Sequence, residues 1–207
     1  MITVIIPSLH TAYLKPLVSA IKKNLPCSHE ILIQSEKGYL KAVLRGVEKA
    51  KGDVLIIMDG DGSHNPVHFR QMFQLLSKAD IVVGSRYVPG GFSNDIFLRR
   101  IISRFFCKLT RFVLDLNIAD VMSGFIVLRK STLKSININA FGYKIGLDIL
   151  MQAKGKFSVL ECPIVFRKSR MGDYVKLRNI KDGVQTLTFI AKLFICRVSL
   201  VSTHKIA

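Results

Sequence analysis

The sequence has few acidic residues and no long uncharged apolar segment. Its 207 residues include 14 Asp and Glu against 31 Lys and Arg, which gives a formal net charge of +17 at pH 7. In the apolar C-terminal segment the longest uncharged run, residues 183–191, is nine residues long, too short to span a bilayer. The N-terminus lacks a positive region followed by a long apolar core, so we interpret it as a first strand and not as a signal peptide.

Cysteine pairs with redox or metal-binding spacing are also absent. The four cysteines are scattered, without a C-x-x-C pair, which is typical of a reduced intracellular protein with buried thiols. His64 and His68 are four residues apart, but Pro66 lies between them, so we do not expect a zinc site there. The length indicates one domain, large enough to fold without disulfides.

The positive charge is concentrated in two segments. Residues 96–130 hold seven Lys or Arg against two Asp, and residues 167–207 hold nine against two. Clustered charge of this kind indicates an anionic partner, which could be nucleic acid, a lipid surface or a phosphorylated substrate. No recognisable nucleic-acid-binding module accompanies the charge, so we do not expect nucleic acid as the partner.

Apolar patterning predicts an α/β fold. Strands are expected at 3–7, 30–33, 54–58 and 81–84, and helices at 14–24, 39–50 and 67–76. Strands that alternate with helices at this spacing predict a mostly parallel sheet with helices on both faces.

Two carboxylates follow the most apolar of these strands, in the stretch KGDVLIIMDGDGSHNP (51–66). Asp59 and Asp61 are separated by Gly60 and followed by Gly62, so a tight turn can direct both side chains out of the carboxyl end of the strand, where open α/β sheets bind ligands. Carboxylates this close repel each other, and a shared Mg²⁺ or Mn²⁺, completed by phosphate oxygens of a substrate, relieves the repulsion. The alternative is a simple Asp-Gly turn, with Asn65 or Ser63 capping the next helix.

A basic amphipathic helix is predicted over about 96–114. Its apolar residues share one face and its basic residues the other; the apolar set is Leu98, Ile101, Ile102, Phe105, Leu109 and Phe112. This composition is typical of a helix that lies in a membrane interface, although a helix packed on the sheet with a solvated basic face has the same pattern. A second apolar segment at 183–201, interrupted by Lys192 and Arg197, favours a protein that lies on a membrane.

Five motifs in order resemble the polyprenyl-phosphate glycosyltransferases of family 2, and most closely the dolichol-phosphate mannose synthases. They are Asp59-Gly60-Asp61, Gly84-Ser85-Arg86-Tyr87 with Pro89-Gly90-Gly91, Arg99-Arg100-Ile101-Ile102-Ser103, Asp120-Val121-Met122-Ser123-Gly124-Phe125, and Pro163-Ile164-Val165-Phe166 followed by basic residues and Gly172. Each motif is weak alone, but the ordered set spans most of the chain. The resemblance implies a GT-A (Rossmann-like) fold and an inverting, metal-dependent transfer of mannose or glucose from GDP-mannose or UDP-glucose to a polyprenyl (dolichyl) monophosphate.

The resemblance also implies roles for individual residues. Asp59 and Asp61 would hold the metal and the donor diphosphate, with Ser63 at a position where the family often has a further ligand. Arg86, Arg99 and Ser103 would bind the acceptor phosphate, together with Arg167 or Arg170, of which we favour Arg170. The remaining expected substrate-binding residues are Pro7, Gly38, Asp120, Ser123, Gly124 and Asp148. Residues 1–177 would form the GT-A domain and residues 178–207 an interface helix, placing a peripheral enzyme on the cytoplasmic face of the membrane.

Two segments depart from the family pattern. The family normally has P-x-Y-N-E after the first strand, where this chain has Pro7-Ser8-Leu9-His10, and it ends its second strand with an Asp that contacts the nucleobase. Residues 31–37 contain no Asp. These departures keep a second hypothesis open, an inactive or partner-dependent homologue, besides the basic nucleic-acid-binding protein as a third.

Overall fold

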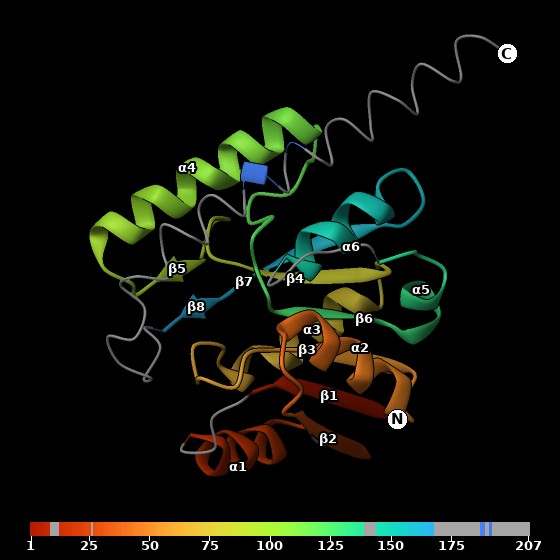
Figure 1. The fold of residues 1–207 in the computed structure, drawn as a ribbon. Coiled ribbons are helices and arrows are strands. Elements are labelled where there is room, and N and C mark those ends of the chain that lie inside the picture. Colours follow the sequence, from red (N-terminus) through yellow and green to blue (C-terminus); the bar gives the residue numbers. More distant parts are fainter. Residues whose placement is uncertain (9–12, 26, 139–143, 168–186, 189–190, 192–207) are drawn as a thin grey trace, which may run out of the picture.

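The computed structural model describes residues 1–8, 13–25, 27–138, 144–167, 187–188 and 191 (Figure 1). The strands are β1 Ile2–Pro7, β2 His29–Gln34, β3 Val54–Ile57, β4 Ile81–Ser85, β5 Phe92–Ser93, β6 Ile126–Arg129, β7 Val159–Pro163 and β8 Val165–Phe166. The helices are α1 Leu14–Asn24, α2 Tyr39–Lys49, the 3-10 helix η1 Pro66–His68, α3 Phe69–Leu76, α4 Phe97–Leu114, α5 Lys130–Lys134 and α6 Ile145–Ala153. The elements predicted up to residue 114 are confirmed, with small shifts at their ends.

Six strands form one mixed sheet in the order β2-β1-β3-β6-β4-β7. Every neighbouring pair is parallel except the two that involve β6, which runs antiparallel between β3 and β4. The mostly parallel α/β fold is therefore confirmed. The sequence patterns did not predict β6 or β7.

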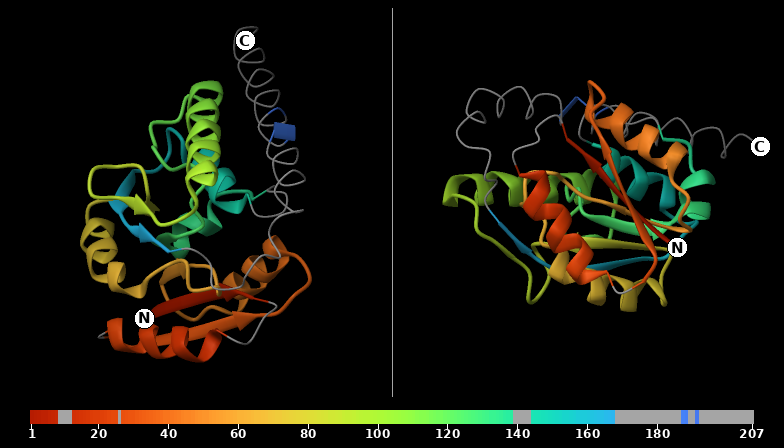
Figure 2. Two further views of the ribbon diagram at one scale, coloured as in Figure 1. Left: turned by 90° about the vertical axis from the view of Figure 1, so that its left-hand side faces the viewer. Right: turned by 90° about the horizontal axis from the view of Figure 1, so that it is seen from below.

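Helices cover both faces of the sheet, because side chains alternate along each buried strand. On one face, Val4 and Ile6 of β1 pack with apolar residues of α1 and α3. On the other, Ile5 of the same strand packs with α2, α4, α5 and α6. Figure 2 shows these two helical layers on opposite sides of the sheet. Their packing holds the strand ends in fixed positions.

The carboxyl ends of β3 and β4 meet the beginning of β6 at one edge of the sheet. Ile126 pairs with Ile57 of β3 and with Val83 of β4, and the Gly84 amide donates to the Phe125 carbonyl over 2.8 Å. The motifs that begin at Asp59, at Arg86 and at Asp120 therefore reach the same edge, although they are far apart in sequence.

The apolar stripe of α4 faces away from the protein core. Its members Leu98, Ile101, Ile102 and Phe105 are exposed, and Phe112 is 87% exposed. The helix instead buries Cys107, Thr110 and Leu114, and it lies at the edge of the molecule beside β5 (Figure 1). The interpretation in which this stripe packs on the sheet is therefore wrong.

No helix within the described ranges is long and apolar enough to cross a membrane. The predicted C-terminal interface helix and Arg170 lie outside the described residues, apart from residues 187, 188 and 191 of that helix.

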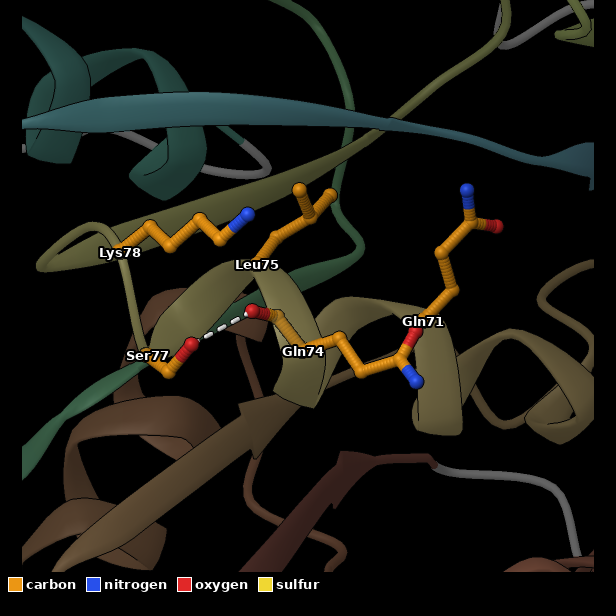
Figure 3. Close-up of a pocket in the computed structure, with 5 residues that line it drawn as sticks. All are labelled: Gln71, Gln74, Leu75, Ser77 and Lys78. Atoms are coloured by element: carbon orange, nitrogen blue, oxygen red, sulfur yellow. Dashed lines mark hydrogen bonds between the residues drawn. The ribbon is translucent and has the colours of Figure 1, made fainter.

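A shallow depression of about 480 Å³ lies along α3, and Figure 3 shows the side chains that line it: Gln71, Gln74, Leu75, Ser77 and Lys78. The C-terminal end of α3 leads into the amino end of β4, whereas the predicted site motifs lie after the carboxyl ends of the strands. The depression contains none of the predicted site residues.

Candidate active site

The turn after β3 joins two of the three predicted metal ligands, Asp61 and Ser63, by hydrogen bonds. The Asp61 carboxylate accepts hydrogen bonds from the backbone amide and the hydroxyl of Ser63, at 3.0 and 2.6 Å. Gly62 has a φ of 77°, and a Cβ there would lie 2.0 Å from the Tyr13 ring, so the turn requires glycine. Asn65 caps η1 by accepting from the Val67 amide at 3.2 Å. The Asn65 cap is confirmed, while Ser63 binds Asp61.

Asp59 lies where its negative charge is disfavoured. Its side chain is 36% exposed, yet protein atoms surround it closely enough that desolvation raises its pKa, and the nearby Asp61 charge raises it further. A hydrogen bond of 3.0 Å from the Tyr39 hydroxyl acts in the opposite direction. Burial and the same carboxylate raise the pKa of Tyr39 well above its usual value, so Tyr39 remains a donor.

The surroundings of Asp59 fit a divalent cation. Two neighbouring carboxylates are the hard oxygen ligands that Mg²⁺ and Mn²⁺ prefer, and a cation would relieve their repulsion. Gly124 leaves the space beside both Asp59 oxygens open, since a Cβ there would lie 3.7 Å from each. In the described part of the chain, no three His, Cys, Asp or Glu side chains gather into a metal site, so the remaining ligands would come from substrate and water.

The two histidines near this turn accept backbone hydrogen bonds. His64 Nδ1 accepts from the Asp59 amide, and His68 Nε2 accepts from the Val165 amide, both at 3.1 Å. His64 is buried and stacks on Phe125, with ring centroids 4.9 Å apart. These contacts give both histidines structural roles.

Arg86 follows β4 and forms a two-pronged ion pair with Asp120. Its Nε and Nη2 donate to the two carboxylate oxygens, each at 2.7 Å, and its backbone amide donates to Asp120 Oδ2 at 3.0 Å. The Arg86 side chain is 14% exposed and the Asp120 side chain 0%. Burial lowers the pKa of Arg86, but the hydrogen bonds and charge of Asp120 outweigh it and hold that pKa above its usual value.

Tyr87 brings α4 to this ion pair. Its hydroxyl donates to Ser103 Oγ at 2.7 Å, and the guanidinium carbons of Arg86 and Arg104 lie 5.0 and 5.3 Å from its ring centre. Arg99 lies one helical turn before Ser103 and pairs with Asp95 at 3.5 Å. Tyr87 therefore links two predicted phosphate-binding residues, Arg86 and Ser103, and the third, Arg99, lies one helical turn from Ser103 on α4.

Further predicted residues lie near Asp59. Pro7 ends β1, and a Cβ at Gly60 would lie 2.7 Å from the Cβ of Ser8, so the end of β1 borders the aspartate turn. Gly38, with a φ of 105°, directly precedes Tyr39 at the start of α2.

Ser123 and Asp148 are buried. Ser123 Oγ accepts from the Phe125 amide at 3.2 Å, and a Cβ at Gly146 in α6 would lie 2.5 Å from the Ser123 carbonyl oxygen. Asp148 lies on that helix with 0% exposure. It is thus close to the site in the fold without facing solvent.

Three residues of this region were not predicted: Tyr39, Arg104 and Glu161. Tyr39 follows the predicted Gly38, but its contact with Asp59 spans 20 positions. Glu161 accepts hydrogen bonds from the backbone amides of Ala119 and Asp120, at 2.7 and 3.0 Å. No local pattern marks either residue, whereas the series of basic residues on α4 could have indicated Arg104.

Comparison with known proteins agrees with the motifs. The family model described as glycosyl transferase family 2 matches residues 4–136, more than half of the chain. The protein belongs to glycosyl transferase family 2. It is 40% identical over 136 residues to a dolichol-phosphate mannosyltransferase of Pyrococcus furiosus, a match that covers 63% of this chain and 38% of that protein.

Two further relatives carry related names. An undecaprenyl-phosphate mannosyltransferase of Micrococcus luteus is 33% identical over 141 residues, covering 65% of this chain and 57% of the relative. A dolichol-phosphate mannosyltransferase of Mycosarcoma maydis is 35% identical over 211 residues, covering 92% and 71%. The chain thus spans less than two thirds of the P. furiosus and M. luteus relatives.

The fold is that of solved GT-A proteins. Glucosyl-3-phosphoglycerate synthase from Mycobacterium tuberculosis superposes with a TM-score of 0.69 at 16% identity, covering 93% of this chain and 78% of that one. Another structure of that enzyme, described as a complex with Mn²⁺, UDP-glucose and phosphoglyceric acid, has a TM-score of 0.69 at 15% identity, with the same coverage.

Proposed function

We propose that this protein transfers a hexose, mannose or glucose, from GDP-mannose or UDP-glucose to a polyprenyl monophosphate such as dolichyl phosphate, with inversion. The family assignment supports glycosyl transfer. The names of the relatives support a polyprenyl phosphate acceptor and mannose as the sugar.

The observation that carries this proposal is that α4 has a polar side next to Arg86 and an exposed apolar side opposite to it. On one side of its first turns, Ser103 accepts a hydrogen bond from Tyr87, whose ring contacts Arg86, and Arg99 lies one turn before Ser103. The opposite side exposes Leu98, Ile101 and other apolar residues. A phosphate group joined to a long hydrocarbon chain matches both surfaces, because arginine binds phosphate oxygens and the apolar side chains can enter the interfacial layer of a membrane.

The acceptor side of the reaction requires charge and orientation. A phosphate monoester has its second pKa near 6, so its oxygen is already anionic at neutral pH and can attack the anomeric carbon without a protein base. That attack forms a new carbon–oxygen bond, while the bond from the anomeric carbon to the nucleoside diphosphate breaks and its electron pair leaves with the diphosphate. Arg86, Arg99 and Ser103 would hold the attacking phosphate in line.

The donor side requires stabilisation of the leaving diphosphate. Asp59 and Asp61 would bind a Mg²⁺ or Mn²⁺ ion together with diphosphate oxygens, and the ion would offset the negative charge that develops there. Ser63 keeps the Asp61 carboxylate oriented through its two hydrogen bonds. Tyr39 does the same for Asp59.

We also propose the location and the domain organisation. Residues 1–177 would form the catalytic domain, and residues 178–207 a second interfacial helix. Exposed apolar residues on α4, flanked by basic side chains, support attachment to the cytoplasmic face of a membrane. We propose no nucleic-acid partner.

The test is an assay of purified protein with radiolabelled GDP-mannose and UDP-glucose, a polyprenyl monophosphate and Mg²⁺ or Mn²⁺, followed by chromatography of the lipid products. We expect one sugar to appear in the lipid phase, and no transfer when chelator is in excess. Donor binding without transfer would favour the partner-dependent homologue. Absence of both, with salt-sensitive binding to nucleic acid, would favour the third hypothesis.

A further inference from the structure

We propose that Glu161 is a positioning residue for the acceptor phosphate, acting through Asp120 on the guanidinium of Arg86. The inference rests on the proposed function, in which Arg86 binds that phosphate. It assigns Asp120 to the support of Arg86, whereas the sequence predicted that Asp120 binds substrate directly.

Glu161 fixes the backbone of the segment that carries Asp120. Glu161 lies on β7 and is the register partner of Val83 on β4, so it projects from the strand beside the one that leads into Arg86. Its two carboxylate oxygens accept separately from the Ala119 and Asp120 amides, at 2.7 and 3.0 Å. A charged acceptor that holds two successive amides fixes the position at which Asp120 leaves the backbone.

Asp120 in turn orients the Arg86 side chain through their buried ion pair. Asp120 is wholly buried, and Oδ1 also receives a weak contact from the Cys107 thiol at 3.7 Å. The two side-chain hydrogen bonds to Asp120 use the edge of the Arg86 guanidinium that is formed by Nε and Nη2. Arg86 also contacts two aromatic rings, at 5.0 Å from the centre of Tyr87 and 5.3 Å from that of Phe166. Together these contacts determine the plane of the guanidinium.

The second edge of the Arg86 guanidinium, formed by Nη1 and Nη2, faces away from Asp120. A guanidinium has five N–H donors, and among the described residues Nη1 donates to no acceptor. The edge formed by Nη1 and Nη2 is therefore available for a second two-pronged contact, and phosphate oxygens match that geometry. Because Asp120 offsets the Arg86 charge, Arg86 supplies direction more than net positive charge.

The experiment compares Glu161→Gln with a matched control, Asp80→Asn. Gln keeps the size of Glu but has one acceptor oxygen and an amide group that cannot accept, so at least one of the two backbone bonds is lost. Asp80 also accepts two hydrogen bonds, from the amide and hydroxyl of Ser158 at 2.9 and 2.7 Å. The contact between Asp80 and Ser158 joins β4 and β7 at their amino ends, away from the candidate site.

The first measurement is hydrogen exchange of the Arg86 Nε–H by NMR of protein labelled with ¹⁵N-arginine, with the signal assigned by its loss in Arg86→Lys. We expect exchange about tenfold faster in Glu161→Gln and unchanged in Asp80→Asn. The second is the affinity for farnesyl phosphate, which should fall about tenfold in Glu161→Gln, while the affinity for GDP or UDP stays within about twofold. Asp120→Asn, which keeps both bonds to Glu161, should give the same selective loss.

The outcomes separate the inference from the proposed function. An unchanged Nε–H signal in Glu161→Gln, or an equal loss of farnesyl phosphate and nucleotide affinity, would overturn the role of Glu161. Faster Nε–H exchange with unchanged farnesyl phosphate affinity would show that Arg86 does not bind the acceptor. If the unmodified protein bound farnesyl phosphate no better than inorganic phosphate, the lipid phosphate acceptor itself would be wrong.

Discussion

Asp59 combines a charge that its surroundings disfavour with the place where we propose that a metal ion binds. Desolvation raises its pKa, and the Asp61 charge adds to this, while the hydrogen bond from Tyr39 and the Arg86 charge act in the opposite direction. Carboxylates in such a conflict are characteristic of functional sites. A cation placed between Asp59 and Asp61 would resolve the conflict, whereas a purely structural turn gains nothing from it.

This conflict predicts opposite effects of Asp59→Asn on activity and stability. A pKa that is raised on folding contributes stability that is present at acidic pH and lost as the pH rises through the folded-state pKa. At pH 7 the charged Asp59 therefore opposes folding, and the neutral isostere removes that penalty. We expect the urea midpoint at pH 7 to stay level or rise, while transfer falls on the order of 100-fold because the proposed cation, which would offset the diphosphate charge, loses one of its two carboxylate ligands.

Asp80→Asn serves as the control for this prediction. Hydrogen bonds from Ser158 lower the pKa of Asp80, so its carboxylate stabilises the fold above the unfolded-state pKa, and that stability is lost as the pH falls through the lowered folded-state pKa. Its urea midpoint at pH 7 should therefore fall, with transfer retained. Equal losses of stability in both variants, or full transfer by Asp59→Asn, would contradict the assignment of Asp59.

At the residue scale, features determined within one short segment could be predicted from the sequence, and contacts between distant segments could not. Asp59, Asp61 and the Asn65 cap lie within seven positions of each other, so strand, turn and cap rules apply directly. Tyr39 and Glu161 form their hydrogen bonds with residues 20 and at least 41 positions away. Periodicity carries no information about such contacts.

At the scale of elements, α4 shows the same limit. Periodicity predicted the extent of the helix, 96–114, and which of its residues share a face. It could not say which face packs, because a helix with an apolar stripe usually buries that stripe. Here Cys107, Thr110 and Leu114 are buried instead, and Lys154 secures the end of the helix by binding the Asp115 carboxylate at 2.7 Å.

The outward stripe predicts that large apolar residues of α4 can be replaced at little cost. Ile102 and Phe105 are 46% and 61% exposed, so the double change Ile102→Ser/Phe105→Ser should alter the free energy of unfolding by no more than about 0.5 kcal/mol per site. Leu114→Ala, at a position with no exposure, should cost about 2–5 kcal/mol. Urea denaturation of the three proteins measures both effects, and a cost of several kcal/mol for the serine variant would show that the stripe packs in solution.

The strands β6 and β7 illustrate a second limit. β6 has four residues and enters the sheet antiparallel, between two strands that are earlier in the sequence. A rule based on alternating strands and helices places each new parallel strand at a growing edge, so it cannot predict this insertion. Yet β6 bears on the candidate site, since the segment that leads into it brings Gly124 beside Asp59.

At the scale of the whole molecule, two features would contribute to binding at a membrane. One is the excess of basic residues, 31 against 14 acidic ones, and the other is the exposed apolar stripe of α4. Charge attracts the protein to an anionic surface over about one Debye length, roughly 10 Å at 0.1 M salt. Apolar insertion acts only on contact and is not screened. A protein attached by charge alone, as to nucleic acid, would lose nearly all binding at high salt.

Binding to vesicles therefore distinguishes these two contributions. We expect the protein to sediment with vesicles that contain anionic lipid at 0.1 M salt, and to sediment less at 0.5 M because the electrostatic attraction is screened. The Ile102→Ser/Phe105→Ser protein keeps every charge and, if its free energy of unfolding is unchanged, keeps the fold. It should bind more weakly at 0.1 M and lose the binding that remains at 0.5 M, since only the apolar contribution has been removed.

Equal sedimentation of the two proteins at both salt concentrations would show that α4 does not enter the membrane. An unmodified protein that stays in the supernatant would contradict membrane attachment altogether.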